Sequence, residues 1–329
     1  MSDLNQLAEL IKHEGGFIKQ LESEMGRVII GQKKMVERIL MGLLSGGHIL
    51  LEGLPGLAKT LAVKTLADLI DLNFRRLQFT PDLLPSDLTG TMIYNPKSGE
   101  FFPKKGPIFA NIVLADEINR APAKVQSALL ECMAEKQVTI GEQTYKLEEP
   151  FVVLATQNPI EQEGTYRLPE AQMDRFMFKV LIPYPSKTEE MKILETQSGL
   201  KDAPLKPVAT SNQILKARGL CQEIYLDAKV KDYIIEIVFA TRDPKGRKEL
   251  REIEEFIQIG ASPRATLALA RASRAKAFIE GRAFVTPDDV KAIAPDILRH
   301  RIILSFEAEA QEVNSQQVIN KILSALPTP

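Results

Sequence analysis

A lysine and a threonine follow a glycine-containing loop near the start of the chain. The stretch LLEGLPGLAKTLAVKTLA, residues 50–67, fits the phosphate-loop pattern G-x-x-x-x-G-K-[ST] at Gly53, Lys59 and Thr60, with Ala58 in place of the second glycine. The backbone N–H groups of such a loop and the N-terminus of the following helix cradle phosphate oxygens. Lys59 would reach the outer phosphates, and the Thr60 hydroxyl would ligate Mg²⁺. The sequence therefore predicts a nucleotide site here.

Ala58 is the departure from that pattern. Glycine is needed where φ is positive or where the backbone must approach a ligand closely, and Gly56 supplies this freedom in the middle of the loop. We expect Ala58 to belong already to the first turn of the following helix, with a negative φ. There alanine is about 1 kcal/mol more favourable than glycine. The loop is therefore expected to function, and a chance strand–turn–helix is the alternative.

Polar side chains end two further apolar runs. NIVLADEINR, residues 111–120, ends its apolar part in Asp116 and Glu117, and FVVLATQNP ends in Asn158. The carboxyl ends of parallel strands are where open α/β sheets bind ligands. Asp116 suits the coordination shell of Mg²⁺, Glu117 suits a general base for water, and Asn158 could orient that water or contact the γ-phosphate. A surface acidic pair and an Asn-Pro turn are the structural alternatives.

The elements that must position these residues form an α/β pattern. Helical segments or long connections separate five short apolar runs that are typical of buried parallel strands, namely His48–Glu52, Phe74–Phe79, Ile112–Ala115, Phe151–Thr156 and Phe178–Ile182. From Ser186, which forms a capping box with Glu189, the chain is almost entirely helical in pattern, with the connector KDAPLKPVA, residues 201–209, inside this part. We expect a nucleotide-binding core over residues 1–185 and a helical domain over residues 186–329.

Two insertions have the pattern of β-hairpins. TGTMIYNPKSGEFFPKKGP, residues 89–107, has apolar segments on both sides of a turn-rich NPKSG, and KQVTIGEQTYKLEEP, residues 136–150, alternates around Gly141-Glu142. The apolar side chains of the first hairpin could contact a partner or pack on their own domain, and the sequence leaves both possibilities open. These side chains are Met92, Ile93, Phe101 and Phe102.

Composition excludes several classes of protein. The 329 residues carry a formal net charge of −1, which gives no basic footprint for nucleic acid. No apolar run approaches the ~20 residues of a membrane span, and the polar N-terminus lacks a signal-peptide core. Two cysteines give no disulfide framework, and three scattered histidines give no metal-site spacing. A reducing cytoplasm is the expected location.

Taken together, these motifs resemble the AAA+ ATPases, and most closely the MoxR family. GLPGLAKT resembles the family's Walker A, which often carries alanine before the lysine; LADEINRAP resembles Walker B, and ATQNP resembles sensor 1. LPEAQMDRF and GASPRATLALARAS resemble later signatures, and VIIGQ is similar to the segment that packs on adenine. The implied fold is an AAA+ P-loop NTPase αβα sandwich with a parallel sheet, followed by a small all-α lid domain.

The resemblance also implies the site residues and the cofactors, ATP and Mg²⁺. Thr60 and Asp116 are the expected metal ligands, and Glu117 and Asn158 are expected to be catalytic. The expected nucleotide-binding residues are Val28, Ile29, Gly31, Gln32, Gly53, Pro55, Gly56, Leu57, Ala58, Lys59, Thr60 and Leu61.

Two arginines complete the implied catalytic set. Arg175, in MDRF, resembles an arginine finger that reaches the γ-phosphate in a neighbouring subunit, and Arg264 resembles sensor 2 at a helix start. In the structural alternative Arg175 pairs with Asp174 or Glu170, and Arg264 is a solvent-exposed cation. Arg120 and Arg167 are the competing candidates for the finger.

The function that follows is hydrolysis of Mg-ATP in a homo-oligomeric, hexameric ring. By resemblance, hydrolysis would drive remodelling, chaperone-like activation, or cofactor or metal insertion, with von Willebrand A domain proteins as partners. The alternatives are a nucleic-acid-dependent motor and a nucleotide-gated scaffold without catalysis. A salt-dependent DNA-binding assay distinguishes the nucleic-acid motor from the protein-remodelling ATPase. The presence of Lys59, Glu117 and Asn158 argues against the inactive scaffold.

Overall fold

The computed structural model describes residues 2–159, 166, 168–198 and 205–329. The chain forms two compact units. We call Phe17–Phe176 with Val180–Leu215 the α/β unit, and Met1–Gly16, Met177–Lys179 and Lys216–Pro329 the helical unit. Arg167 and the first part of the expected connector, 201–204, lie outside the described residues.

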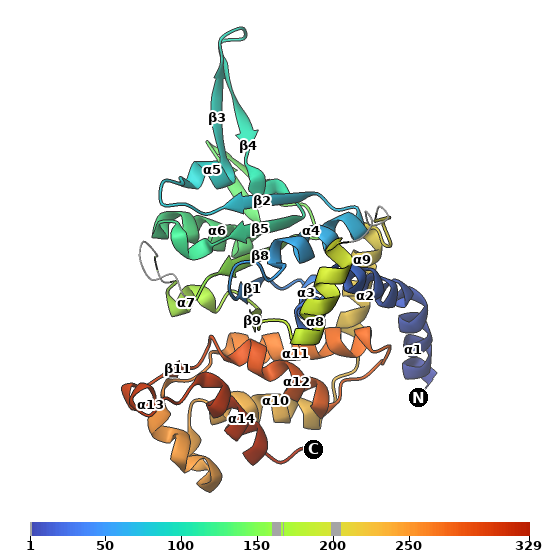
Figure 1. The fold of residues 1–329 in the computed structure, drawn as a ribbon, viewed down its shortest axis with the longest axis vertical. Helices are drawn as coiled ribbons and strands as arrows, with labels where there is room; N and C mark the ends of the chain where they lie inside the picture. Colours follow the sequence, from blue (N-terminus) through green and yellow to red (C-terminus); the bar gives the residue numbers. More distant parts are fainter. Residues whose placement is uncertain (1, 160–165, 167, 199–204) are drawn as a thin grey trace. The chain divides into compact units, whose positions relative to one another are not determined.

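The elements follow one another along the chain as shown in Figure 1. The α-helices are α1 (Ser2–Glu14), α2 (Gly16–Val28), α3 (Lys33–Ser45), α4 (Lys59–Ile70), α5 (Pro85–Thr89), α6 (Ala123–Glu135), α7 (Glu170–Met173), α8 (Lys187–Ser198), α9 (Ser211–Glu223), α10 (Ala228–Ala240), α11 (Pro263–Ile279), α12 (Pro287–Leu298), α13 (Phe306–Ala310) and α14 (Ser315–Ala325). The strands are β1 (Ile49–Glu52), β2 (Phe74–Gln78), β3 (Gly90–Asn95), β4 (Glu100–Lys105), β5 (Ile112–Asp116), β6 (Gln137–Ile140), β7 (Gln143–Lys146), β8 (Val152–Gln157), β9 (Phe178–Leu181), β10 (Ile257–Ile259) and β11 (Ile303–Leu304). Short 3₁₀ helices are η1 (Pro107–Phe109), η2 (Ile118–Arg120), η3 (Pro244–Gly246) and η4 (Lys248–Phe256).

A five-stranded sheet of order β2-β5-β8-β1-β9 organises the α/β unit. The pairs β2–β5, β5–β8 and β1–β8 are parallel, and all five strands lie within a residue of the predicted apolar runs. Every residue of β5 and the first five of β8 are buried. Burial on both faces requires a layer of helices on each side, so the αβα architecture predicted from the sequence is confirmed (Figure 1).

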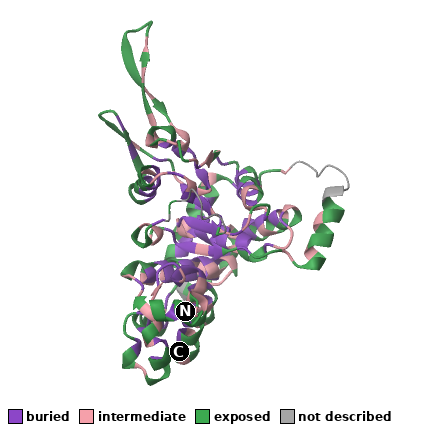
Figure 2. Cartoon of the chain, turned by 60° about the vertical axis from the view of Figure 1, so that its left-hand side comes forward, coloured by how far each residue is buried: buried purple, intermediate pink, exposed green. Residues whose placement is uncertain are grey.

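One face of this sheet contributes to a cluster of buried apolar residues. Alternate strand residues such as Leu50, Val113 and Val153 belong to the same buried cluster as Leu129 and Leu130 of α6. Figure 2 shows this buried interior as the purple centre of the unit. Because α6 starts a few residues after β5, packing of its apolar side on the sheet also fixes the segment that follows Asp116.

The strand register brings the carboxyl ends of four strands to one edge. Glu52 of β1 lies beside Gln157 of β8, and Gln78 of β2 lies beside Asp116 of β5. The loop that follows β1 leads into α4 at the same edge. The polar residues predicted to act together therefore come from four different segments and meet at one end of the sheet.

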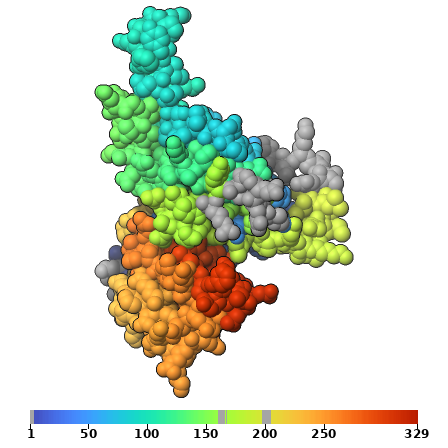
Figure 3. Space-filling view, turned by 90° about the vertical axis from the view of Figure 1, so that its left-hand side faces the viewer, coloured from blue at the N-terminus to red at the C-terminus, as the bar shows by residue number. Residues whose placement is uncertain are grey.

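Both predicted hairpins are present in the α/β unit. β3 pairs with β4 and β6 pairs with β7, each antiparallel, and the two hairpins extend beside one another in Figure 2. At the base of the β3–β4 hairpin, Gly90 has φ +98°, and an added Cβ would lie 2.2 Å from the Lys104 carbonyl oxygen. Backbone segments therefore pack tightly against one another at the base of this hairpin. The hairpin protrudes clearly from the rest of the unit in Figure 3.

The two units do not divide at a single point in the chain. The sequence predicted a boundary between residues 1–185 and 186–329, whereas the contacts join α8 and the following residues to the α/β unit. The backbone N–H of Val208 donates to the Leu69 carbonyl at the end of α4, 2.6 Å away. The chain thus returns to the α/β unit after Pro185 before it enters the helical unit, and the functional boundary remains a proposal.

The helical unit has the predicted helix starts. Thr286 caps α12 in a capping box with Asp289, and the side chain of Ser262 accepts a hydrogen bond at the start of α11. The unit is not purely α-helical, since β10 and β11 form a small antiparallel pair. Within the described residues, no helix combines the length and apolarity that crossing a membrane requires.

Candidate nucleotide site

A cavity of ≈ 450 Å³ lies at the edge of the sheet where the polar strand ends meet. This volume falls within the usual range of ligand pockets. Its walls come from the loop after β1, the start of α4, and the ends of β2, β5 and β8. The lining residues are Pro55, Gly56, Leu57, Ala58, Lys59, Thr60, Leu61, Arg76, Asp116, Glu117, Thr156 and Asn158.

Two residues of the loop between β1 and α4 have a left-handed backbone conformation, with positive φ. Gly56 has φ +81°, as the sequence predicted for the middle of the loop. Ala58 has φ +58° and is the N-cap of α4, which begins at Lys59. The expectation of a negative φ at Ala58 was therefore wrong, because the helix starts one residue later than we assumed. A residue with a Cβ costs roughly 1–2 kcal/mol in this conformation.

Lys59 lies at the first position of α4 and is half-buried. Its Nζ donates to the carbonyl oxygen of Gly53 at the start of the loop. Burial lowers the pKa of Lys59, and the nearby carboxylates of Asp116, Glu117 and Glu52 oppose that shift. A partly desolvated ammonium group beside a loop of backbone N–H groups attracts an anion, and phosphate is the anion that this loop geometry suits.

Asp116 is the most connected side chain of the cavity. Its Oδ1 accepts from the Thr156 hydroxyl at 2.5 Å, and its Oδ2 accepts from Nε and Nη2 of Arg76 at 2.9 and 2.7 Å. The Thr60 hydroxyl lies 3.5 Å from the same Oδ2. Asp116 is buried, so these partners satisfy a carboxylate that would otherwise be costly to keep ionised.

The oxygens of Thr60 and Asp116 fit a magnesium ion. They are hard ligands, they line one cavity, and they lie close enough to share one coordination shell. Among the described residues there is no group of three or more His, Cys, Asp or Glu side chains placed to hold a metal. This chain would therefore bind Mg²⁺ together with nucleotide phosphates, which supply further oxygen ligands.

Glu117 is held in a strained backbone conformation directly after β5. Its φ is +56°, and its backbone N–H donates to the Thr156 hydroxyl oxygen at 2.8 Å. Its Oε2 accepts from Gln78 Nε2 at 2.6 Å and lies 3.2 Å from Nη1 of Arg120. Glu117 thus lines the cavity, and its Oε2 contacts both Gln78 and Arg120. The contact with Gln78 ties the position of the carboxylate to the neighbouring strand β2.

Of the remaining predicted residues near this end of the sheet, Asn158 lines the cavity, whereas the segment VIIGQ does not. Asn158 is buried and directly follows β8. In the segment VIIGQ, Val28 ends α2 and Gly31 has φ +80°; Ile29 is buried, and Gln32 donates to the Pro183 carbonyl. None of these four is among the described lining residues.

The two candidate catalytic arginines lie in different units. Arg175 is exposed in the α/β unit, and within the described part of the chain no hydrogen bond or ion pair engages its guanidinium group, so the predicted alternative of pairing with Asp174 or Glu170 gains no support. Arg264 lies in the first turn of α11 in the helical unit, where its backbone N–H donates to the Ser262 hydroxyl. Arg120 ion-pairs with Glu117.

Sequence reasoning missed three polar residues around the two acids. Arg76 and Gln78 lie on the same side of β2, and Thr156 lies one residue before the end of β8. The alternation of FRRLQ would have placed Arg76 and Gln78 on one face of a strand. Their contact with Asp116 and Glu117 depends on the pairing of β2 with β5, which no local pattern shows.

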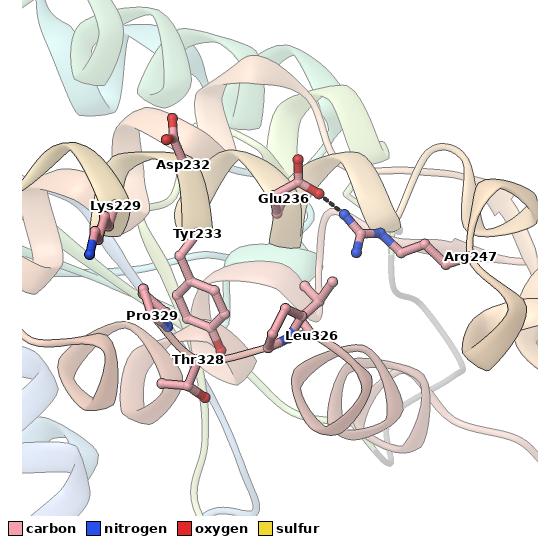
Figure 4. A pocket seen from close by; sticks show the side chains of 9 residues that line it. Lys229, Asp232, Tyr233, Glu236, Arg247, Leu326, Thr328 and Pro329 are labelled. Carbon is pink, nitrogen blue, oxygen red and sulfur yellow. Dashed lines mark ion pairs between the residues drawn. The ribbon is translucent and has the colours of Figure 1, made fainter.

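A second cavity, of ≈ 400 Å³, lies within the helical unit (Figure 4). It is lined by α10 and by the last residues of the chain, with Tyr233 at its centre and an ion pair between Glu236 and Arg247 at one side. Two acids and two bases line it, so it offers no net charge to a phosphate. It contains none of the residues that the sequence predicted to bind nucleotide.

Comparison with known proteins gives consistent matches. The profile described as "ATPase family associated with various cellular activities (AAA)" matches residues 48–178, and the AAA lid domain profile matches residues 250–322. Chaperone MoxR1 of Mycobacterium tuberculosis is 47% identical over 306 residues, which cover 93% of this chain and 81% of that protein. The Bacillus subtilis protein YeaC is 44% identical over 308 residues, with 93% and 92% coverage. A crystal structure of a candidate ATPase from Cytophaga hutchinsonii has a TM-score of 0.92 and 50% identity, with full coverage of both chains.

The conformation of Ala58 predicts the sign of a stability change. Replacing Ala58 with glycine should raise the free energy of unfolding by up to about 1 kcal/mol, because glycine adopts a positive φ without steric cost. Denaturant unfolding of the parent and of Ala58→Gly measures this difference. In a helix interior with negative φ the same substitution would lower stability by about 1 kcal/mol, so a decrease would contradict the left-handed conformation.

The position of Lys59 predicts its role in nucleotide binding. Lys59→Ala should weaken ATP binding about 10- to 100-fold, since a charge-assisted phosphate contact is lost. Lys64→Ala is the matched control, because Lys64 is exposed on the same helix. Calorimetric titration of both variants tests the assignment, and normal affinity of Lys59→Ala for ATP would show that phosphate binds elsewhere.

Proposed function

Because the chain belongs to the MoxR family of AAA+ ATPases, we propose that rings of its subunits use ATP hydrolysis to remodel or activate partner proteins. The chain is an ATPase with the chaperone-type relatives described above. The observation that carries the proposal is that one compact unit contains both the nucleotide cavity and a protruding hairpin with exposed aromatic side chains. Such a unit can couple the state of a nucleotide to a surface that contacts another protein.

We propose a role in hydrolysis for the main polar side chains of the cavity, supported by their common place in its lining. Lys59 and the backbone N–H groups of the loop hold the outer phosphates, and Glu117 accepts the proton of the attacking water. Asn158, at the end of the neighbouring strand, orients that water. A bound Mg²⁺ ion would neutralise phosphate charge at Thr60 and Asp116.

The β3–β4 hairpin is the proposed contact with a partner protein. Tyr94 and Phe101 are 51% and 64% exposed, and their rings form a cross-strand pair with centroids 5.3 Å apart. Aromatic side chains that form a pair yet remain open to solvent are typical of recognition surfaces. Met92 and Phe102 are also partly exposed, which favours partner contact over packing on their own domain.

Assembly into a ring would complete the site with an arginine from a neighbour. The exposed guanidinium group of Arg175 is available for such a contact, and a finger supplied from outside can increase the rate about 10³–10⁵-fold. We propose a homo-oligomeric, hexameric ring on the basis of the family, with Arg175 as the finger and Arg264 as the sensor from the helical unit.

The family also suggests the class of partner and the compartment. Partners with a von Willebrand A domain, and cofactor or metal insertion as the outcome, remain proposals that rest on the family alone.

The cytoplasm is the proposed compartment, since Cys132 and Cys221 are both free and buried. Burial raises the pKa of the Cys132 thiol to about 11, so this group stays protonated and unreactive.

Substitution of Glu117 and of Asp116 should affect ATP binding and hydrolysis differently. Glu117→Gln should bind ATP with near-parent affinity and hydrolyse it at least about 100-fold more slowly, because it keeps the shape of the side chain but cannot accept a proton. Asp116→Asn should also weaken Mg²⁺-dependent binding. Phosphate release and calorimetry measure both effects, with Glu131→Gln on the exposed side of α6 as control. Retained turnover in Glu117→Gln would exclude Glu117 as the base.

If Arg175 acts on the nucleotide of a neighbouring subunit, two variants that are each inactive alone should restore activity when mixed. Arg175→Ala should bind ATP but turn over slowly, and Lys59→Ala should lack bound nucleotide. In mixed rings, an Arg175→Ala subunit with ATP can face a Lys59→Ala subunit that still offers its arginine, so activity should return. No recovery at any mixing ratio, with mixed assembly shown by crosslinking, would contradict an arginine acting between subunits.

The hairpin contact predicts a loss of partner capture without a loss of nucleotide binding. Glu117→Gln should retain partners in the presence of ATP, and adding Tyr94→Ser with Phe101→Ser should abolish that retention, because the apolar contact area is removed. Leu194→Ser is the matched control, since Leu194 is 64% exposed on α8. Affinity purification followed by mass spectrometry measures retention. Equal loss in the control, or none in the hairpin variant, would exclude the hairpin as the contact.

A further inference from the structure

Both carboxylate oxygens of Asp116 accept hydrogen bonds from protein groups, and Oδ2, the oxygen beside Thr60, accepts two from one side chain. Oδ1 accepts from Thr156, and Oδ2 accepts two hydrogen bonds from Arg76. The Thr60 hydroxyl, the other expected metal ligand, is directed at the same Oδ2. A cation that coordinates Asp116 beside Thr60 must therefore share or replace the position of the Arg76 guanidinium group.

We propose that Arg76 and the Mg²⁺ of the bound nucleotide compete for Asp116, so that Arg76 is a positioning residue that sets the Mg²⁺ concentration at which nucleotide binds. The proposal rests on the assignment of this cavity as the ATP site. While no metal is bound, Arg76 donates two hydrogen bonds to this carboxylate and supplies the opposite charge. Binding of metal and nucleotide then requires the guanidinium group to leave Oδ2.

The surroundings of Arg76 allow it to leave. Its side chain is 50% exposed, whereas that of Asp116 is 11% exposed, so the arginine can turn into solvent while the acid stays in place. Because half of the guanidinium side chain is solvated, the ion pair is only moderately strong. Arg76 therefore behaves as an exchangeable counter-ion, in contrast to Thr156, whose side chain is buried.

Departure of Arg76 would also affect the second acid. Nη2 of Arg76 donates to Oε1 of Gln78 at 3.0 Å, which leaves Nε2 of Gln78 to donate to Glu117. One guanidinium group thus contacts the metal-binding acid directly and orients the amide that holds the proposed base. Exchange at Asp116 would release that amide at the same time.

The chain offers a control on the same strand. Arg75 is adjacent to Arg76 but lies on the opposite side of β2 and is exposed, so Arg75→Gln makes the same change in net charge outside the cavity. Arg76→Gln removes the competing charge and keeps a hydrogen-bonding side chain of similar reach. Arg76→Lys keeps the charge and should restore parent behaviour in part.

Mg²⁺ titration of nucleotide binding tests the competition. We would measure binding of ADP and of a non-hydrolysable ATP analogue by calorimetry over a range of Mg²⁺ concentrations, in the parent and the three variants. Arg76→Gln should reach half-maximal binding at an about three- to tenfold lower Mg²⁺ concentration than the parent. Arg75→Gln should match the parent, and Arg76→Lys should lie between the two.

Three other outcomes have distinct meanings. An unchanged Mg²⁺ dependence in Arg76→Gln would overturn the competition. Weaker nucleotide binding in Arg76→Gln both with and without Mg²⁺ would also overturn it, because Arg76 would then be a phosphate ligand. Failure of the parent to bind nucleotide at all would instead overturn the assignment of the cavity, which distinguishes failure of the proposed function from failure of this inference.

Discussion

The site depends on the hydrogen bonds and the ion pair that surround the carboxylate of Asp116, which is buried at the end of a central strand. An isolated buried carboxylate would be strongly unfavourable, so the fold surrounds it with donors from three other segments. Thr60 is the second residue of α4, Arg76 comes from β2 and Thr156 from β8. The same contacts therefore align the start of α4, the edge strand β2 and the strand β8 around one point.

The sequence predicted the fold well where a short local pattern determines structure. The five strands of the sheet are apolar runs between helical segments, and both hairpins have turn-forming residues at their centres. The prediction failed at Ala58, because the position where a helix begins decides the backbone angle of the preceding residue, and a shift of one residue changes its sign. A motif fixes which residues surround a phosphate more reliably than it fixes their backbone conformation.

Residues that act through tertiary contacts were beyond local patterns. Asp116 and Glu117 are recognisable because they end an apolar strand, whereas Arg76 and Gln78 look like ordinary polar positions of an edge strand. Their importance arises only when β2 pairs with β5. In that pairing Phe74 lies opposite Ile112, which is 38 residues later in the sequence. The return of the chain to α4 after Pro185 is missed for the same reason, since it involves tertiary contacts such as the hydrogen bonds from the backbone N–H groups of Val208 and Ala209 to the Leu69 carbonyl.

The tight base of the β3–β4 hairpin has a mechanical consequence. Each strand has six residues, so the hairpin extends about 20 Å from the base where Gly90 packs against backbone. A tilt of about 10° at this base would move the tip by about 3 Å, enough to break one set of side-chain contacts and form another. The base follows α5, which contacts α6, and α6 follows the strand of Asp116. Angular changes too small to disturb the packed sheet would thus become displacements of several ångströms at the tip of the hairpin, the proposed contact surface.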